Sequence, residues 1–358
     1  MKKSVYLLVS LLGIAFLGSC TTNQYTVTAT FPDDTFDGEW ARITATHDGS
    51  VLDSTLIEEQ TAVFTGTIKT PTLCLIGSGR SRGQLILEGG TITIDLQEPG
   101  TPAYGEGTQL NTELAGLITK YNGLMDEIMS YQGGDSEGYY RTVWVPKLTE
   151  EIGAVFKANS NNDIGTLALM YLSNYGDEEL LDEYFDKAGK VVTSRGPIQK
   201  IIKQRTALKE TAEGMPFVDF TIEDSDGETV SFSDYIGQGK YVLVDFWAGW
   251  CGPCKREIPH IREVYDQYNG EDFTVLGVAV WEEPEATKKA MEELGVIWPS
   301  IINAQSIPTD IYGISGIPHI ILFGPDGTIV ARGLRGEGMK AKIAEIMEPE
   351  EVEEEVEK

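Results

Sequence analysis

The sequence predicts a multidomain protein with an N-terminal β-sandwich, a central α-helical region and a C-terminal α/β domain. Three patterns in the 358 residues support this fold class. Apolar and polar residues alternate up to about residue 98, apolar residues recur every three or four positions from 108 to 211, and strand and helix patterns alternate from residue 214. These periods are typical of strands, of amphipathic helices and of an α/β sheet. A chain of this length is also expected to hold two or three domains.

The composition excludes several classes of protein. Apolar residues make up 41% and charged residues 23%, which is ordinary for globular domains and argues against wholesale disorder, a collagen-like repeat or a multi-span membrane protein. Lys and Arg number 28 against 56 Asp and Glu, so the formal net charge is −28. Such a chain repels phosphate backbones, and we expect no nucleic-acid partner.

The first residues indicate the compartment. Lys2 and Lys3 precede an apolar run over 5–17, which is too short to span a bilayer but suits a signal peptide over 1–19. The run ends in Leu17-Gly18-Ser19-Cys20, which resembles the lipobox of bacterial lipoproteins. The resemblance implies that Cys20 is lipidated and becomes the mature N-terminus, and Thr21 after it favours the outer membrane. An ordinary secretory signal with an incidental Cys is the alternative.

Residues 20–105 are expected to form the β-sandwich, with antiparallel strands. Gly, Asp and Pro separate stretches that alternate or are rich in β-branched residues, as is typical of strands joined by turns. The details "LDST", "VFTGTI" and "LILEGGTITI" resemble an uncharacterised β domain of envelope lipoproteins. The predicted strands cover 25–30, 41–46, 62–68 and 85–96, the last stretch interrupted by a turn at Gly89-Gly90.

Residues 106–212 are expected to be helical. From Leu110 to Ile128 the apolar residues form one stripe. Asp163 is a plausible cap for the helix that follows it, and Pro197 suits a first helical turn. The further helices are predicted at 139–158, 163–175, 177–188 and 197–211.

Residues 213–347 are expected to form the α/β domain, followed by an acidic, disordered tail over 348–358. Each of the two predicted hairpins has a Gly-containing turn. The predicted hairpins pair 217–220 with 229–232 and 320–323 with 328–332; the buried strands are 241–247 and 273–281, and the helices are 251–268, 286–294 and 339–347.

The strongest chemical signal is Cys251-Gly252-Pro253-Cys254 between a buried strand and a helix. Two thiols at this spacing in a first helical turn are close enough to form a disulfide. The helix N-terminus favours the thiolate of Cys251, which makes it the nucleophile, and Cys254 would resolve the mixed disulfide. Half of a zinc site and a permanent structural disulfide are the alternatives; the remaining Cys and His residues supply no second ligand pair, so no metal is expected.

The surrounding residues carry a close family resemblance. "VLVDFWAGWCGPCK" resembles thioredoxin, while "FVDFTIEDSDGETVSFSDY" and "CKREIP" resemble the membrane-tethered TlpA/ResA branch of the thioredoxin superfamily. The resemblance implies a thioredoxin-like domain in which Asp245 relays protons to the resolving cysteine and Glu257 modulates the cysteine pKa values. A buried lone carboxyl should have a raised pKa. Thioredoxin's partner Lys is not matched, since Gly277 takes its place; purely structural roles for both acids are the alternative.

The resemblance also assigns the substrate-binding residues. Gly316-Ile317-Pro318 matches the cis-proline loop that faces the dithiol and pairs with bound polypeptide. Trp247 and Trp250 are expected to pack the site, and His319 either contacts substrate, senses pH or is inert. The expected substrate-binding residues are Trp250, Gly252, Pro253, Ile317 and Pro318.

The function implied is that of an envelope thiol–disulfide oxidoreductase on the periplasmic face of a membrane. It would reduce disulfides of protein substrates, receive electrons from a membrane donor, and need no cofactor beyond the redox-active Cys251–Cys254 disulfide. A thiol peroxidase of the peroxiredoxin type is one alternative, although the residues before Cys251 lack that family's Pro and Thr. A partner-binding lipoprotein that uses the thioredoxin fold as a scaffold is another.

Overall fold

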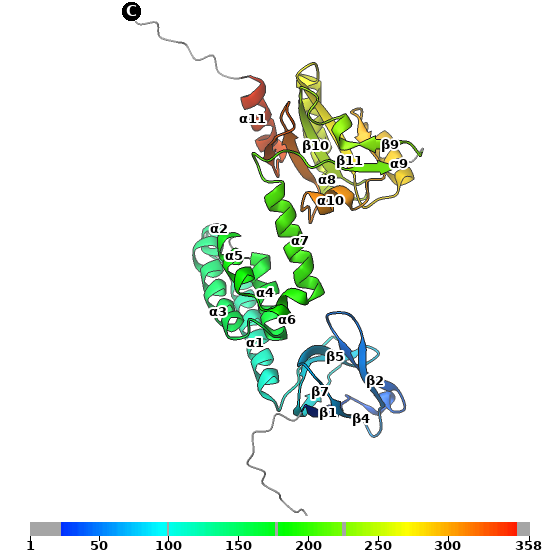
Figure 1. The fold of residues 1–358 in the computed structure, drawn as a ribbon, viewed down its shortest axis with the longest axis vertical. Coiled ribbons are helices and arrows are strands. Elements are labelled where there is room, and N and C mark those ends of the chain that lie inside the picture. The colour runs from blue at the N-terminus through cyan, green and yellow to red at the C-terminus, as the bar shows by residue number, and fades with distance from the viewer. Residues whose placement is uncertain (1–22, 99, 176–177, 224–226, 349–358) are drawn as a thin grey trace, which may run out of the picture. The chain divides into compact units, whose positions relative to one another are not determined.

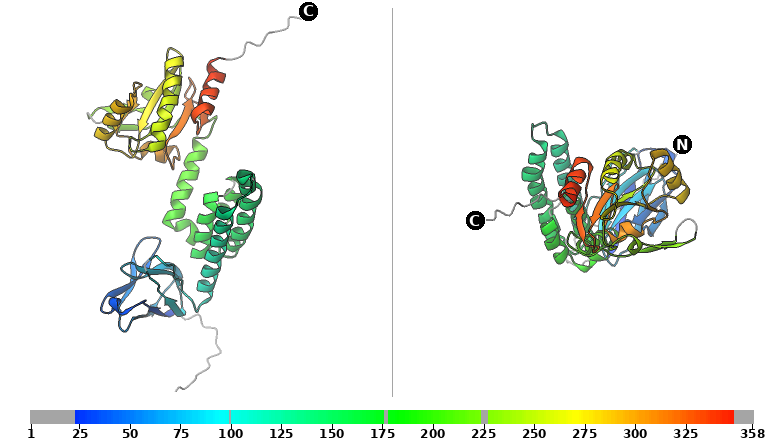
Figure 2. Two further views of the ribbon diagram at one scale, coloured as in Figure 1. Left: turned by 180° about the vertical axis from the view of Figure 1, so that it is seen from behind. Right: turned by 90° about the horizontal axis from the view of Figure 1, so that it is seen from above.

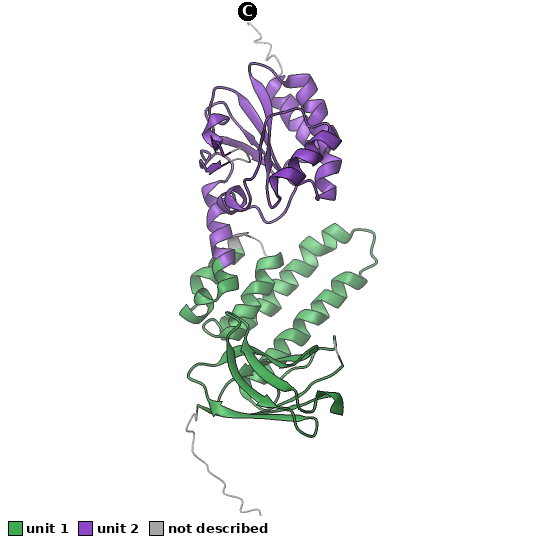
Figure 3. Ribbon diagram, turned by 90° about the vertical axis from the view of Figure 1, so that its right-hand side faces the viewer, with its two compact units in different colours: residues 1–199 green, residues 200–358 purple. Residues whose placement is uncertain are grey.

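The computed structural model describes residues 23–98, 100–175, 178–223 and 227–348. The predictions for the signal peptide, for Cys20 and for the tail beyond Glu348 lie outside these residues. The chain divides into two compact units, 1–199 and 200–358 (Figure 3). The predicted border at 105 between the β domain and the helical region falls inside the first unit, and the domain boundaries stay predictions.

The first unit opens with seven strands in two sheets (Figure 1). One sheet has the order β4-β1-β7 and the other β3-β2-β5-β6. Both sheets contribute to one buried cluster that includes Val27, Ile43, Phe64 and Leu85, while the packing of a sandwich stays a prediction. The strands are β1 (Gln24–Thr30), β2 (Trp40–Ala45), β3 (Val51–Leu56), β4 (Thr61–Thr67), β5 (Thr72–Ser78), β6 (Ser81–Leu87) and β7 (Gly90–Asp95).

The expectation of purely antiparallel pairing is wrong for β7. This strand pairs with β1 in parallel register, with Val27 opposite Ile92. The predicted turn at 89–90 therefore leads from β6 in one sheet to β7 in the other. Gly90 has φ 125°, a conformation that L side chains rarely adopt, which explains the Gly at this crossing.

The helical part follows the predicted stripes. Trp144 is fully buried, and its indole N–H donates to the Leu124 carbonyl at 2.6 Å. Pro197 lies in the first turn of its helix, as predicted. The helices are α1 (Gln109–Ser130), α2 (Ser136–Tyr139), η2 (Tyr140–Trp144), α3 (Val145–Ala158), α4 (Asp163–Tyr175), α5 (Glu178–Lys187), α6 (Lys190–Ser194) and α7 (Gly196–Glu210).

Asp163 does not cap α4, contrary to expectation. The Asn162 side chain accepts hydrogen bonds from the first free amides of the helix, those of Ile164 and Gly165. The Asp163 carboxylate instead accepts from the Leu73 amide at 2.7 Å and pairs with Arg195 at 2.6 Å. It links β5 to α4 and to the residue after α6, which a pattern of local caps does not reveal.

The second unit is built on a five-stranded mixed sheet in the order β12-β11-β10-β13-β14. β11 lies parallel to β10, and β13 lies antiparallel to it. Figure 2 shows α8 and α11 of this unit beside each other, and they are in contact. The elements are β8 (Thr221–Glu223), β9 (Thr229–Ser231), η3 (Phe232–Asp234), β10 (Tyr241–Trp247), α8 (Gly252–Tyr268), β11 (Phe273–Ala279), α9 (Pro284–Leu294), β12 (Ser300–Ile301), α10 (Ile307–Ile311), β13 (His319–Phe323), β14 (Ile329–Arg332) and α11 (Gly336–Met347).

The first predicted hairpin of this unit is misplaced by several residues. Its first strand is Thr221–Glu223 rather than 217–220. The residues before it instead run beside the β13–β14 hairpin, with the Phe217 amide donating to the Gly327 carbonyl at 2.9 Å. Tertiary hydrogen bonds take the backbone groups that the sequence pattern assigned to a local ladder.

No helix among the described residues combines the length and apolar character needed to cross a bilayer. In the same part of the chain, no group of three or more His, Cys, Asp or Glu side chains is arranged to hold a metal ion.

Candidate active site

The two cysteines of the motif form a disulfide at the start of α8. Their Cα atoms are 5.2 Å apart, within the usual range for a disulfide. Cys251 is the N-cap residue, and its Sγ accepts a hydrogen bond from the Cys254 amide at 3.1 Å. Cys251 is 4% exposed and Cys254 is fully buried. In this arrangement the first sulfur lies at the positive end of the helix and the second lies behind it.

The sequence around the cysteines explains this local structure. β10 is a buried apolar strand that delivers the chain to the turn at 248–250. Pro253 occupies the first turn of α8, where its missing N–H costs no helical hydrogen bond. The Gly249 amide donates to the Glu282 carboxylate at 2.9 Å, and the Thr287 hydroxyl donates to the same oxygen. The segment after β11 thus holds the turn before the dithiol.

The proline loop has the expected geometry. The Ile317–Pro318 peptide bond is cis. Ile317 is partly buried and packs against the cluster that contains both cysteines, while Gly316 is exposed. The loop therefore packs on the core cluster that contains the disulfide.

Asp245 is buried on the side of the sheet that packs against the cysteine cluster. Leu243 and Trp247, which share its face of β10, belong to the cluster that contains both cysteines, so Asp245 points to the same side. It is 2% exposed, and its Oδ1 has no hydrogen-bond partner among the described residues. Burial raises the pKa of Asp245 to about 7; the charge of Arg335 opposes this shift and that of Glu257 adds to it. The carboxyl is thus suited to exchange a proton near neutrality.

The Glu257 side chain on α8 is buried and hydrogen-bonded to the start of α11. It lies one turn after Cys254 on α8 and is 8% exposed. One of its oxygens accepts a hydrogen bond from the Gly336 amide at the start of α11. A buried carboxylate with a backbone donor is consistent with the predicted electrostatic role and equally with a structural link between α8 and α11.

Arg335 is a member of the site that sequence reasoning missed. It is the N-cap residue of α11, and its charge lowers the pKa of both Asp245 and His319. The neighbouring Leu334 amide donates to the Ile320 carbonyl, which places this loop at the strand beside Asp245. The motif "RGLRGEG" supplies a cation before the last helix, but only the fold shows that it lies near the buried acid.

The two tryptophans behave differently from each other. Trp247 is buried against the cysteine cluster, as predicted. Trp250 is 60% exposed, so the expectation that it packs the site is wrong. Its indole N–H donates to the Trp281 carbonyl at 3.3 Å, which holds the ring on the surface beside the dithiol. Gly252 and Pro253 are exposed as well, so three of the expected substrate-binding residues are open to solvent.

His319 lies on the opposite face of the sheet from Asp245. It pairs with Phe246 in the register of β13 and β10, and Phe246 belongs to the second core cluster of the unit. Burial, with added repulsion from Arg332 and Arg335, lowers the pKa of His319 to about 4. The imidazole is therefore neutral near pH 7, which argues against a pH sensor in the neutral range.

The geometry supports two-electron exchange between the dithiol and an external disulfide. A sulfur at a helix N-terminus, a second sulfur behind it and a buried acid with a pKa near 7 are the parts this chemistry needs.

Comparison with known proteins gives the same picture. Residues 214–332 match the AhpC/TSA family, and residues 25–114 match a domain of unknown function, DUF4369. The thiol–disulfide oxidoreductase ResA of Bacillus subtilis is 31% identical over 119 residues, which cover 33% of this chain and 65% of that protein. ResA of Geobacillus thermodenitrificans is 32% identical over 126 residues, or 35% of this chain and 70% of that protein.

Among solved structures, the thioredoxin domain of a thiol–disulfide oxidoreductase from Bacteroides vulgatus is 35% identical. It covers 38% of this chain and 97% of that chain, with a TM-score of 0.34. The AhpC/TSA match covers the part of the chain that carries the dithiol. Through this C-terminal domain, the chain belongs to the ResA-like thiol–disulfide oxidoreductases.

Proposed function

We propose that this oxidoreductase reduces disulfides of protein substrates with its Cys251–Cys254 dithiol while a lipid on Cys20 tethers it to an envelope membrane. The observation that carries the proposal is the position of Cys251 at the N-cap of α8, with Cys254 buried behind it and the cis-proline loop packed on the same core cluster. We assign substrate contact to the exposed Trp250, Gly252 and Pro253, to the partly exposed Ile317 and to the backbone of the buried Pro318.

The exchange begins from the reduced protein. The Cys251 thiolate attacks one sulfur of the substrate disulfide, the S–S bond breaks, and the departing substrate thiolate takes up a proton. Cys254 then loses its proton and attacks Cys251 Sγ, which releases the second substrate thiol. Two electrons pass to the substrate, and the protein is left with the Cys251–Cys254 disulfide.

Asp245 is the proton acceptor for the second step. Cys254 is fully buried, so its thiol has no direct route to bulk water. A carboxyl with a pKa of about 7 is partly ionised at neutral pH and able to take this proton. We assign Glu257 and Arg335 to the adjustment of Asp245, since the charge of each acts on its pKa.

The residues between the cysteines favour reduction of substrates. Gly252-Pro253 offers neither a positive charge nor a side-chain donor to a thiolate. Less stabilisation of the thiolate makes the disulfide comparatively stable and the dithiol a good reductant. We expect a potential nearer to that of thioredoxin, about −270 mV, than to that of DsbA, about −120 mV.

Equilibration of the purified protein with glutathione buffers tests this direction. A potential above roughly −180 mV would make the protein an oxidant or isomerase instead. Consumption of hydrogen peroxide, measured with the same preparation, tests the peroxidase alternative: turnover faster than that of a protein disulfide would favour it.

A dithiol that works in the envelope requires a supply of electrons. An oxidising envelope returns the dithiol to the disulfide, so a membrane protein with a reactive dithiol must return two electrons and two protons. The lipobox-like sequence supports a lipoprotein, with the outer membrane favoured by Thr21. Mass spectrometry of the mature protein tests the anchor, because an unmodified N-terminus at residue 21 or later would contradict it.

A further inference from the structure

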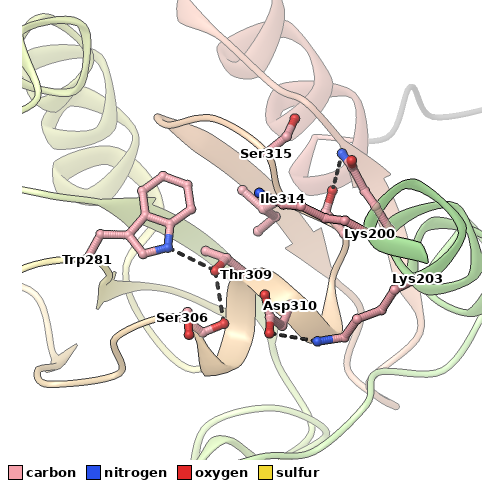
Figure 4. A pocket seen from close by; sticks show the side chains of 10 residues that line it. Lys200, Lys203, Trp281, Ser306, Thr309, Asp310, Ile314 and Ser315 are labelled. Carbon is pink, nitrogen blue, oxygen red and sulfur yellow. Dashed lines mark hydrogen bonds and ion pairs between the residues drawn. The ribbon is translucent and has the colours of Figure 1, made fainter. Parts of the chain in front are cut away.

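A groove of about 450 Å³ lies on the second unit beside the proline loop (Figure 4). Its volume falls in the range of ligand-binding clefts. Lys200 and Lys203 of α7 line one side, Trp281 lines another, and Ile314 and Ser315, which precede the proline loop, contribute to it. None of these residues takes part in the exchange chemistry described above.

The groove adjoins the dithiol through two segments. Ser315 is exposed and stands two residues before Ile317, whose side chain packs against the cysteine cluster. Trp281 accepts the indole hydrogen bond of Trp250, which is next to Cys251 in the chain. A polypeptide held at the disulfide by Trp250 and the proline loop would therefore continue into this groove.

The walls of the groove are fixed rather than loose. The Trp281 indole N–H donates to the Thr309 hydroxyl at 3.2 Å, and its backbone has φ 56°, which is strained for a bulky residue. The Gln204 side chain donates to the Gly313 carbonyl at 3.3 Å. Figure 4 draws the Trp281–Thr309 contact as a dashed line.

The C-terminal end of α7 is held to the same unit. Arg332 donates to the Thr211 carbonyl, just past the end of the helix, and to the Thr211 hydroxyl at 2.6 Å. This clamp and the Gln204 contact keep the lysine-bearing part of α7 on the surface of the thioredoxin-like domain.

The charge of the groove differs from that of the chain. Lys203 pairs with Asp310 at 2.7 Å, and Lys200 has no ion-pair partner among the described residues. Both lysines are exposed. In a chain with a formal charge of −28, an acidic polypeptide is repelled over most of the surface, so two lysines beside the dithiol give it a favoured position.

We propose that this groove binds an acidic segment of the protein substrate that flanks the disulfide to be reduced. Lys200 pairs with a substrate carboxylate, Lys203 exchanges Asp310 for a second one, and Trp281 packs against the apolar parts of the same segment. The proposal rests on the proposed function and adds to it a substrate class, protein disulfides with acidic flanking residues.

Two synthetic peptides test the proposal. Each carries one intramolecular disulfide, with three Glu residues on one flank of the first peptide and three Gln residues in the second. The reduced full-length protein should reduce the acidic peptide about fivefold faster, measured as a second-order rate constant at low salt. The preference should fall as ionic strength rises, because screening weakens exposed charge pairs.

Lysine variants distinguish an effect of the groove from an effect of the protein's total charge. Lys200→Gln/Lys203→Gln should abolish the preference, and Lys200→Glu/Lys203→Glu should reverse it. The matched control, Lys289→Gln/Lys342→Gln, removes one exposed and one partly exposed lysine outside the groove and should keep the preference. All three should reduce a small aromatic disulfide at the parent rate.

The outcomes distinguish a failure of the groove proposal from a failure of the proposed function. If the parent reduces both peptides at equal rates, or if the groove variants keep the preference, the groove does not bind acidic segments while the proposed function stands. If the parent reduces the small disulfide but neither peptide, the proposed function itself is overturned, and the groove proposal with it.

Discussion

Asp245 of β10 lies directly opposite Gly277 of β11 in the parallel register. Thioredoxin has a lysine at the position that Gly277 matches, so this carboxyl has no cation on the neighbouring strand. A larger residue would fit there only if the Ser300 side chain moved, because a Cβ on Gly277 would come within 2.6 Å of the Ser300 hydroxyl. Burial therefore dominates the electrostatics of Asp245, and the cation that moderates it, Arg335, comes from the loop before α11.

The pKa of Asp245 predicts a pH-dependent stability. Its folded-state pKa is about 7, above the ordinary value of 3.8, so the unfolded chain loses this proton first as the pH rises. The contribution of the neutral carboxyl to the free energy of unfolding is fully present below about pH 4. It is lost as the pH rises toward the folded-state pKa of about 7. Each pKa unit corresponds to about 1.4 kcal/mol, so the loss is on the order of a few kcal/mol.

Asp245→Asn removes this titration. Denaturant unfolding of the oxidised variant should show a gain in stability over the parent at pH 8 and little gain at pH 4. Equal effects of the substitution at both pH values would mean that the carboxyl ionises normally in the folded protein.

Glu257 and Arg335 should shift the pKa of Asp245 in opposite directions. Glu257→Gln removes a negative charge that raises it, and the pKa should fall; Arg335→Gln removes a positive charge that lowers it, and the pKa should rise. Carboxyl-carbon NMR of the oxidised protein measures both. Arg335→Lys is the control that keeps the charge, and shifts of the same sign in the two Gln variants would refute the assignment.

The two cysteines should differ in their capacity to trap substrates. Cys251 lies at the N-cap of α8, where the helix stabilises a thiolate, while Cys254 is fully buried. Cys254→Ser should accumulate mixed disulfides on non-reducing gels, and Cys251→Ser should not. Trapping by Cys251→Ser alone would reverse the roles of attacking and resolving thiol.

Arg332 should stabilise the attachment of α7 to the second unit. Its guanidinium donates to Thr211, which is fully buried, and to the Tyr312 carbonyl at 2.5 Å. Arg332→Met leaves these acceptors without a donor and should cost about 1–3 kcal/mol in the free energy of unfolding. Arg256→Met, at an exposed position on α8, is the matched control and should change stability by less than about 0.5 kcal/mol.

His319 should remain neutral throughout the physiological range. Its pKa is lowered to about 4 by burial and by the charges of Arg332 and Arg335. In imidazole NMR spectra, the resonance that disappears in His319→Gln should not move between pH 8 and pH 5. A midpoint near 6.5 would show that the ring is solvated.

The sequence predicts the position of the dithiol well because that position depends on local structure. A Cys-x-x-Cys pair after a buried strand places Cys251 at a helix N-terminus and Cys254 behind it, and no distant residue is needed for this. Asp245 follows from the same stretch, six residues earlier on β10. Helical periodicity likewise predicts most of the elements from α1 to α7.

Other features depend on long-range pairing that no local pattern encodes. The first hairpin is misplaced because residues near Phe217 bond to Gly327, 110 positions away in the chain. The chain crosses from one sheet to the other after β6, so β7 pairs with β1 in parallel rather than with β6 in a hairpin. The turn residues at Gly90 do not show this.

By itself, the sequence determined where the dithiol and the acid Asp245 lie, since both positions follow from neighbouring residues on one strand and one helix. Only the tertiary structure decided what surrounds them. Arg335 approaches Asp245, and Lys203 meets Asp310, because the folded sheet and its covering helices bring together segments about 90 to 107 positions apart. Contacts of this range depend on how whole elements pack, and so the tuning of the acid and the groove beside the dithiol belong to the fold.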